Sequence, residues 1–348
     1  MSYLQAIVIA LVQGVTELFP ISSLGHSVLF PAWFGGSWET MVTQSSQANS
    51  ASSFYLAYIV ALHVATALAL LWFFRLDWIR IIRGFFRSVR RSFGDRHVSV
   101  IGSDERLAWL IVVATIPVGI TGLLLEHTFR TLLAKPIAAS IFLFVNGLIL
   151  LAGERSARRA EAARAPQRGR RAAAAPAGVR GGSRGDVPIA GGSPDLEAEG
   201  ARQQRGPRSA GELAAAYASD VRISRLPFLD GLFVGVLQIS ALCAGISRDG
   251  ITMVGGLWRG LNREDAARFA FLLATPPILA AGVLKLPDLT GHAAAHIHGQ
   301  VVVGFMITGV TAYLCVRWLL RYFRTGRTLT PFAIYCLVAG VASIIRFA

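Results

Sequence analysis

The stretch of sequence that decides the fold reads, from residue 13 to residue 26, Gln13-Gly-Val-Thr-Glu17-Leu-Phe-Pro20-Ile-Ser22-Ser23-Leu-Gly25-His26. It places an acid, an amide, two hydroxyls and an imidazole inside a segment that is otherwise apolar enough for a lipid bilayer. Polar and ionisable groups at membrane depth are costly and persist mainly where they line a cavity or pair with one another. We name residues 13–26 the first polar island and predict that it forms a functional site inside a membrane.

A second polar island lies in similar apolar surroundings far downstream and reads Gly245-Ile-Ser247-Arg248-Asp249-Gly250. Each island would be costly in lipid by itself, and the cost falls if the two clusters meet and satisfy one another. The two islands therefore predict one site shared by distant parts of the chain.

The composition indicates a membrane protein rather than a soluble domain. The 348 residues are 53% hydrophobic and 16% charged, whereas globular proteins average about 45–50% apolar and about 25% charged residues. The net charge of +14 is expected at an anionic lipid surface, and no nucleic-acid partner is expected. The three cysteines, Cys243, Cys315 and Cys336, are too widely spaced to predict a disulfide framework or a zinc site.

Apolar runs near the roughly 20 residues that cross a bilayer predict six full transmembrane helices. They lie at about residues 54–74, 108–125, 137–153, 266–285, 300–323 and 330–346. Two further stretches, 1–35 and 226–258, are interrupted by Gly, Pro, Ser and the polar islands. We predict that each forms a re-entrant helical hairpin, so the fold class is an all-α integral membrane protein.

Charge in the connecting segments predicts how the helices are oriented, because short cytoplasmic loops collect Lys and Arg. The segments rich in Arg, predicted to be cytoplasmic loops, are 75–96, 154–225 and 321–327. The segments with few or no Lys and Arg, predicted to lie outside, are 36–53, 126–136 and 287–300. Both termini are then extracytoplasmic.

One hairpin followed by three spans gives each half of the chain an odd number of crossings, so the second half is inverted relative to the first. A weak sequence symmetry agrees with this inversion. Gly14-Val-Thr-Glu17 and Gly235-Val-Leu-Gln238 share the pattern Gly-Val-x followed by an acid or its amide. We predict an inverted repeat whose hairpins meet near the midplane. The first repeat is residues 1–153 and the second is residues 226–348.

The segment between the repeats, residues 154–225, is rich in Arg, Ala, Gly and Pro and poor in large hydrophobic residues. Such a composition buries too little apolar surface to fold. We predict a disordered cytoplasmic linker, with a helical start at residues 154–164 that continues the preceding span.

The first island offers groups for metal binding and for catalysis. Gln13 and Glu17 are four residues apart and share one helix face, which suits two oxygen ligands for Mg²⁺ or Ca²⁺. An interhelical hydrogen bond is the structural alternative. His26 can act as a nucleophile or as a general acid or base, and a serine such as Ser23 becomes a nucleophile beside such a base.

The two turns offer groups for phosphate binding. After Pro20, the re-entrant turn with Ser22 and Gly25 is predicted to present backbone N–H groups to an anion. In the second island, Gly245 and Gly250 flank Ser247 and Arg248, so a tight turn presents a hydroxyl and a guanidinium that binds phosphate. A buried pair of Arg248 with Asp249 or Glu17 is the structural alternative. His63, inside the first full span, suits a supporting site role and a plain interhelical hydrogen bond equally well.

With these residues in place, the chain resembles the undecaprenyl-diphosphate phosphatase family of bacterial inner membranes, the bacitracin-resistance type of integral membrane phosphatase. Residues 13–26 are similar to that family's Glu/Gln-xxx-Glu motif followed by Pro-x-Ser-Ser-x-Gly-His, and residues 244–250 to its Pro-Gly-x-Ser-Arg-Ser-Gly. The resemblance covers both repeats and leaves the linker as an insertion. It implies hydrolysis of undecaprenyl diphosphate to undecaprenyl phosphate, which recycles the lipid carrier for peptidoglycan synthesis and confers bacitracin tolerance.

The resemblance also implies roles for individual residues: metal binding or catalysis for Gln13 and Glu17, nucleophilic attack or proton transfer for Ser23 and His26, and phosphate binding for Ser247 and Arg248. Whether Ser23, His26 or water attacks stays open. The metal, the isoprenoid length, the side of substrate entry and the oligomeric state, a homodimer included, also stay open.

This chain departs from the family pattern at three positions. Leu24 stands where a Thr is common, Ala244 stands where the pattern has Pro, and Asp249 stands where it has a second Ser. The loss of a hydroxyl at residue 24 and the gain of an acid at residue 249 affect phosphate contacts and metal ligation.

Two other functions fit parts of the pattern. A polyprenyl-phosphate transporter or flippase would use the same inverted repeat and the same Arg and Glu. The other class of membrane lipid phosphatase also uses Ser-Gly-His and Ser-Arg, but it places a His five residues after the Arg, where this chain has Met253. A structural scaffold would not need a buried Arg.

Overall fold

The computed structural model describes residues 1–40, 54–95, 100–133, 135–173, 210–284 and 297–348, and every regular element in these ranges is a helix. This confirms the predicted all-α fold class for the described part of the chain. Parts of the predicted outer loops 36–53, 126–136 and 287–300, and most of the predicted linker, lie outside the described residues.

Each predicted span is a helix in the structure. These helices are α4 (Phe54–Phe73), α6 (Ser103–Leu133), α7 (Pro136–Ala173), α12 (Arg263–Leu284), α14 (His298–Arg324) and α15 (Thr330–Phe347). Within the described ranges, five helices are long and apolar enough to cross a membrane, or up to seven if two bent helix pairs each count as one span. Exposed apolar side chains recur every four residues along α14, at Val302, Met306, Val310 and Leu314. The chain is therefore a multi-pass membrane protein.

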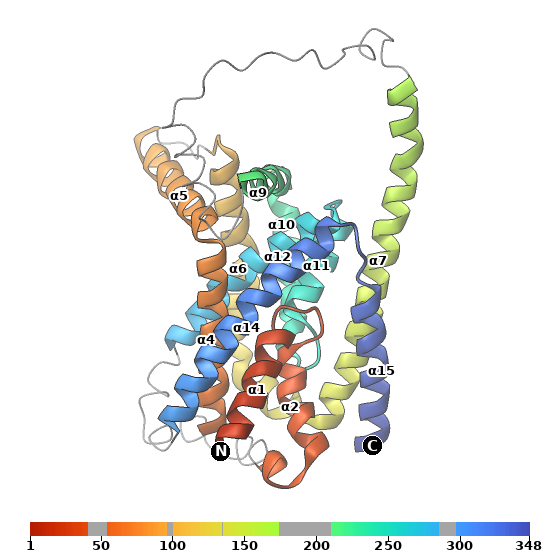
Figure 1. The fold of residues 1–348 in the computed structure, drawn as a ribbon. Helices are drawn as coiled ribbons and strands as arrows, with labels where there is room; N and C mark the ends of the chain where they lie inside the picture. Colours follow the sequence, from red (N-terminus) through yellow and green to blue (C-terminus); the bar gives the residue numbers. More distant parts are fainter. Residues whose placement is uncertain (41–53, 96–99, 134, 174–209, 285–296) are drawn as a thin grey trace, which may run out of the picture.

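The polar islands lie at the turns of two short hairpins. The first hairpin consists of α1 (Tyr3–Thr16) and α2 (Ser23–Phe34), and the second of α10 (Phe228–Leu237), the 3₁₀-helix η3 (Gln238–Leu242) and α11 (Arg248–Trp258). The first hairpin lies toward the end of the bundle that carries both termini, and the second approaches from the opposite end (Figure 1). The turns of the two hairpins are in contact inside the bundle, because the N–H of Gly245 donates a hydrogen bond to Ser22.

Capping side chains and a proline set the ends of the two helices in the first hairpin. Ser2 and Gln5 form a reciprocal capping box that satisfies N–H groups at the start of α1. Pro20 follows the last turn of α1 and cannot continue a helix, because it lacks the N–H that the next hydrogen bond needs. The Ser22 side chain then caps α2 by accepting a hydrogen bond from the N–H of Gly25. The predicted helix-turn-helix pattern of residues 1–35 is therefore present.

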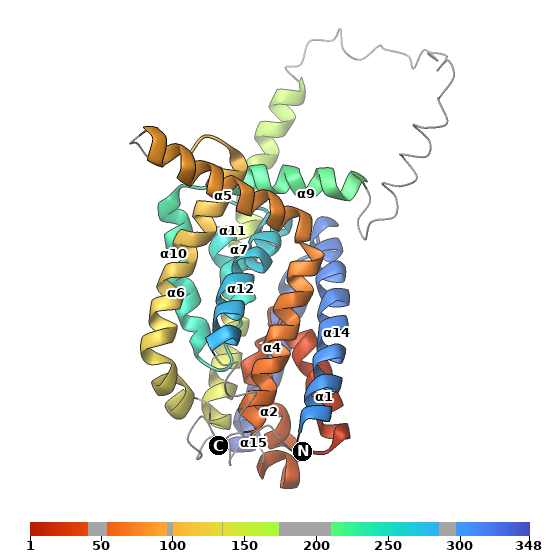
Figure 2. The same ribbon diagram turned by 90° about the vertical axis from the view of Figure 1, so that its left-hand side faces the viewer.

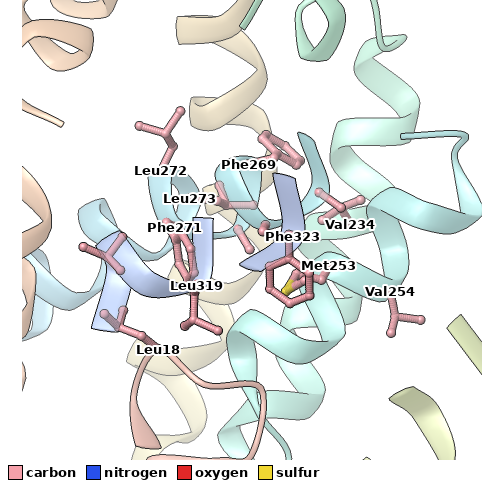
Figure 3. Packing of buried hydrophobic residues seen from close by; sticks show 14 of the residues in the cluster. Leu18, Val234, Met253, Val254, Phe269, Phe271, Leu272, Leu273, Leu319 and Phe323 are labelled. Carbon is pink, nitrogen blue, oxygen red and sulfur yellow. The ribbon is translucent and has the colours of Figure 1, made fainter. Parts of the chain in front are cut away.

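The core holds the hairpin turns between the long helices. Leu18 of the first turn, Met253 of α11, Phe271 of α12 and Leu319 of α14 belong to one buried cluster (Figure 3). All four side chains have no exposed surface. Because lipid is as apolar as these side chains, close packing rather than the exclusion of water holds helices together at this depth.

Residues 75–95, predicted as a cytoplasmic loop, form the helix α5 (Arg75–Asp95), which bends by 83° away from α4. Figure 2 shows α5 and α9 (Ala210–Ile223) lying across the end of the bundle. Apolar side chains recur through the Arg-rich sequence of α5, and Asp77, Ile81 and Ser88 are buried. The prediction counted charge and missed this amphipathic period, which gives α5 one face that packs on the protein.

The segment predicted as a disordered linker, residues 154–225, is helical at both ends. Helix α7 continues to Ala173, beyond the helical start predicted for residues 154–164, and α9 occupies residues 210–223. Asp220 of α9 accepts two hydrogen bonds from Arg268 of α12, at 2.6 and 2.9 Å, and a further one from Arg80 of α5. These ion pairs and the fully buried Ile223 hold α9, so a rule based on average hydrophobic content missed it. Residues 174–209 lie outside the described residues.

We expect Asp220→Asn to lower the thermal unfolding midpoint in detergent substantially, because it removes one partner of the buried Arg268 side chain. Breaking a buried ion pair in this way costs about 3–5 kcal/mol. Asp230→Asn is the matched control, because Asp230 pairs at 3.3 Å with the partly exposed Arg259 and such pairs contribute about 0–1 kcal/mol. Equal midpoints for the two variants would contradict the anchoring role of Asp220.

Candidate active site

Glu17 is the centre of the first island. It follows the last residue of α1, is 7% exposed, and both of its carboxylate oxygens have partners. Four side chains surround it: Arg248 donates to Oε1 at 2.5 Å, Gln13 donates to Oε2 at 2.9 Å, His63 Nε2 lies 3.2 Å from Oε2, and the Ser23 hydroxyl donates to Oε2. The sequence-predicted residues Gln13, Glu17, Ser23 and Arg248 are thus brought together.

His63 is a partner of Glu17 in the structure. It comes from α4, and its Nδ1 lies 2.8 Å from the Ile59 carbonyl oxygen. A carbonyl only accepts, so Nδ1 carries a proton and Nε2 faces the Glu17 carboxylate. Of the two roles that the sequence left open, a supporting role at the site is the one that this geometry favours.

His26 lies in the first turns of α2 and both of its ring nitrogens have partners. Nδ1 lies 2.6 Å from the Ser22 carbonyl oxygen, and Nε2 lies 2.7 Å from the Tyr335 hydroxyl of α15. The two rings are stacked with centroids 5.7 Å apart. Since Nδ1 must donate to the carbonyl, Nε2 is the nitrogen available for proton transfer. In the described residues the Ser23 hydroxyl donates to Glu17 and not to His26.

The second island forms the start of α11. Ser247 caps this helix by accepting a hydrogen bond from the N–H of Gly250 at 3.1 Å. Arg248 and Asp249 form the first turn. Asp249 is 2% exposed, and its Oδ2 atom, like Nε of Arg248, is buried without a hydrogen-bond partner in the described part of the chain. The unpartnered Nε of Arg248 is a donor that a phosphate oxygen can fill, whereas Oδ2 of Asp249 is an acceptor that a cation or a proton can satisfy.

The two turns touch each other through glycine. The N–H of Gly245 donates to Ser22 Oγ at 3.1 Å, and the N–H of Gly25 donates to the same oxygen at 3.2 Å. A Cβ atom on Gly25 would lie 2.9 Å from Cα of Gly245, and Gly245 has φ +117°. Any side chain at either position would separate the turns or strain the backbone.

This contact involves part of the predicted phosphate site. The groups of Ser22, Gly25 and Gly245 that were expected to bind phosphate bond to one another in the structure. The first N–H groups of a helix have no partner inside that helix. In the described structure, the N–H groups left for an anion are therefore those of Ser23 and Leu24 in α2 and of Arg248 and Asp249 in α11. Both helix starts attract negative charge.

Sequence reasoning missed two further residues near the site, Tyr335 and Asn146. Tyr335 gave no signal, because a partly exposed aromatic residue is ordinary in a membrane span. Asn146 did give one, since it is a lone amide in the apolar run from Ile141 to Leu151, and polar groups in such runs are costly.

Comparison with known proteins identifies the family to which the chain belongs. The sequence model of the family described as "Bacitracin resistance protein BacA" matches residues 6–177 and 208–342, which include both islands, five of the six long helices and most of α15. The chain belongs to the BacA family. The match breaks between residues 177 and 208, inside the segment that the sequence identified as an insertion.

Curated BacA-family relatives cover nearly the whole chain. A protein of Frankia alni named undecaprenyl-diphosphatase 2 is 54% identical, with 100% of this chain and 98% of the relative covered. An undecaprenyl-diphosphatase of Mycolicibacterium paratuberculosis is 51% identical, with the same coverage. An undecaprenyl-diphosphatase 2 of Burkholderia orbicola is 36% identical, with 96% of this chain and 92% of the relative covered. The family resemblance inferred from the two islands is confirmed.

Proposed function

We propose that this protein hydrolyses undecaprenyl diphosphate to undecaprenyl phosphate and inorganic phosphate. The observation that carries the proposal is the full-length similarity to proteins named undecaprenyl-diphosphatase. Ser23 and Arg248 both bond to Glu17 and supply groups for the chemistry, and His26 lies three residues after Ser23. This reaction returns the monophosphate carrier for peptidoglycan synthesis, and bacitracin resistance follows from the family name.

The contacts of Ser23 favour it as the nucleophile. Its hydroxyl already donates to Glu17, so the carboxylate can accept the proton when the oxygen attacks the terminal phosphorus. Arg248 and the free N–H groups of α2 and α11 then face the charge that develops on the phosphoryl oxygens. The bond to the bridging oxygen breaks, undecaprenyl phosphate leaves, and water hydrolyses the phosphoserine. His26, through Nε2, is the group for proton transfer in one of these steps.

We propose a divalent cation, Mg²⁺ or Ca²⁺, as the cofactor. The donors present fit such a hard cation, since Glu17, the Gln13 amide and the unpartnered Oδ2 of Asp249 all offer oxygen. The described residues contain no group of three His, Cys, Asp or Glu side chains placed to hold a metal, so substrate phosphate and water would supply the remaining ligands, as is common for Mg²⁺. When bound, the cation would neutralise phosphate charge.

We also propose the predicted arrangement of six spans and two re-entrant hairpins as an inverted repeat in the bacterial inner membrane. In support, Gly14 of α1 packs closely on Thr308 and Thr311 of α14, while Gly235 of α10 packs closely on Ala114 of α6. Each hairpin thus uses a matching glycine to approach the middle span of the other repeat. Both termini lie at the end opposite α5 and α9 (Figure 1), as expected if the termini are extracytoplasmic and the linker is cytoplasmic.

We expect purified protein in detergent to release inorganic phosphate from undecaprenyl diphosphate and, with a different KM, from farnesyl diphosphate. A chelator should abolish release and Mg²⁺ or Ca²⁺ should restore it, whereas Glu17→Gln should stay inactive with metal. Removal of an essential acid–base group costs about 10²–10⁴-fold in rate. A protein that moves the lipid between leaflets of a vesicle but releases no phosphate would be a transporter, and release that is insensitive to the chelator would contradict the cation.

A further inference from the structure

Asn146 is a buried amide within the apolar part of α7. Its side chain has no exposed surface, and the residues on either side of it belong to a membrane span. An amide at this depth has to use its hydrogen-bonding groups to offset the cost of leaving water. Where those bonds lead indicates what the residue does.

The three hydrogen bonds of Asn146 join three separate segments. Nδ2 donates to the Pro20 carbonyl at 2.9 Å and to Cys336 Sγ of α15 at 3.3 Å. Oδ1 accepts the N–H of Ser247 at 3.0 Å. One planar amide therefore binds the turn of the first island through its nitrogen and the turn of the second island through its oxygen.

The backbone that carries this amide is fixed in place. The next residue, Gly147, packs so closely on α15 that a Cβ atom there would lie 2.8 Å from Leu337 Cγ and 2.9 Å from the Ala333 carbonyl oxygen. Helices α7 and α15 are therefore in close contact at the residue next to Asn146. Asn146 is a short side chain on this closely packed helix, and both partners within the turns are backbone atoms.

We propose that Asn146 is a positioning residue for the phosphatase reaction, one that holds the start of α11 in register with the turn before α2. Ser247 directly precedes Arg248, and Pro20 lies three residues before Ser23. The amide therefore sets the spacing between the guanidinium and the serine hydroxyl. A shift of about 1 Å in such a spacing can cost about 100-fold in rate. The inference rests on the proposed function, because it assigns Asn146 to that site.

The test compares steady-state kinetics of Asn146→Leu with wild type, using farnesyl diphosphate and phosphate release. Leucine is similar in size but cannot bond to either turn. We expect kcat to fall about 10–100-fold while KM changes by less than about threefold, because the groups that bind phosphate remain present but are misaligned. The matched control is Ser140→Ala on the same helix, since the buried Ser140 bonds to Pro136 of its own helix and should keep wild-type kcat.

A second variant, Asn146→Ser, separates a loss of catalysis from a loss of folded protein. Asn146→Ser keeps a donor and an acceptor but is too short to reach both turns, so kcat should fall in the same direction. Rates are expressed per protein in the monodisperse peak of size-exclusion chromatography, so a stability effect alone would leave kcat unchanged. Unchanged kcat in the folded variants would overturn the positioning role.

A double-mutant cycle separates positioning from general packing. Ser22 joins the same two turns through Gly245, so the losses in kcat from Asn146→Ser and Ser22→Ala should be strongly non-additive. Additive losses would overturn the proposal. Absence of phosphate release by wild-type protein would instead contradict the proposed function, and the positioning role with it.

Discussion

Arg248→Lys is expected to reduce kcat/KM for isoprenoid diphosphates by about 100-fold or more, since loss of one preorganised donor to a developing phosphoryl or acyl oxyanion typically costs 10²–10³-fold. Arg248 holds Glu17 Oε1 at 2.5 Å with one terminal nitrogen and keeps Nε buried without a partner. It can therefore bind the acid and a phosphate oxygen at once. A lysine ammonium is a single compact charge and cannot reproduce this fork.

The measurement is phosphate release across a range of substrate concentrations. Arg259→Lys is the matched control, because Arg259 follows the other end of α11, is partly exposed and pairs with Asp230, and its activity should be near wild type. Arg248→Lys with more than about a third of wild-type kcat/KM would show that charge alone suffices, and the bidentate role would then be wrong.

The hairpins could be predicted from sequence because their evidence is local. Pro20 ends one helix, Ser22 caps the next, and the polar groups between them cannot face lipid. The long apolar helices were equally accessible, since hydropathy identifies a candidate span without knowledge of its neighbours. The partnership of the two islands also followed, because two costly clusters in lipid are best satisfied by each other.

The use of each polar atom could not be predicted in the same way. The turn of Ser22 and Gly25 was expected to bind phosphate, yet the N–H groups of Gly25 and Gly245 both donate to the Ser22 hydroxyl. That choice depends on how near the second repeat approaches, which is set by packing of α7 and α10 on their neighbours. Sequence shows that a donor is present, but only the three-dimensional arrangement shows whether the donor is already used.

In the Arg-rich segment between the repeats, the sequence-based prediction missed ordered structure. Composition averaged over residues 154–225 predicted disorder, although α9 within it is anchored by Asp220 and, through Arg222, by Asp265 of α12. A carboxylate near the end of a low-complexity segment gives no hint of a partner about 50 residues away, because ion pairing leaves no periodic pattern of the kind that apolar faces produce.

His26→Ala is expected to lower kcat by about 10²–10⁴-fold, the range for loss of a general acid or base. The ring is held with its Nδ1 proton on the Ser22 carbonyl and its Nε2 atom at the Tyr335 hydroxyl, so a single nitrogen is oriented for proton transfer. Tyr335→Phe is the comparison variant, since it removes the hydroxyl and keeps the stacked ring. Its loss should be smaller, because the imidazole itself remains.

Trapping the reaction intermediate shows which atom attacks phosphorus. Quenching with denaturant at neutral to mildly alkaline pH, where phosphoserine and the acid-labile phosphohistidine both survive, followed by peptide mass spectrometry, should find phosphate on Ser23, because this hydroxyl is the one that donates to Glu17. In His26→Ala the same adduct should accumulate if His26 activates the water that hydrolyses it. Phosphate found on His26 in wild type would instead make the imidazole the nucleophile. Full turnover by His26→Ala would remove the residue from the mechanism and leave Glu17 as the sole acid–base group beside Ser23.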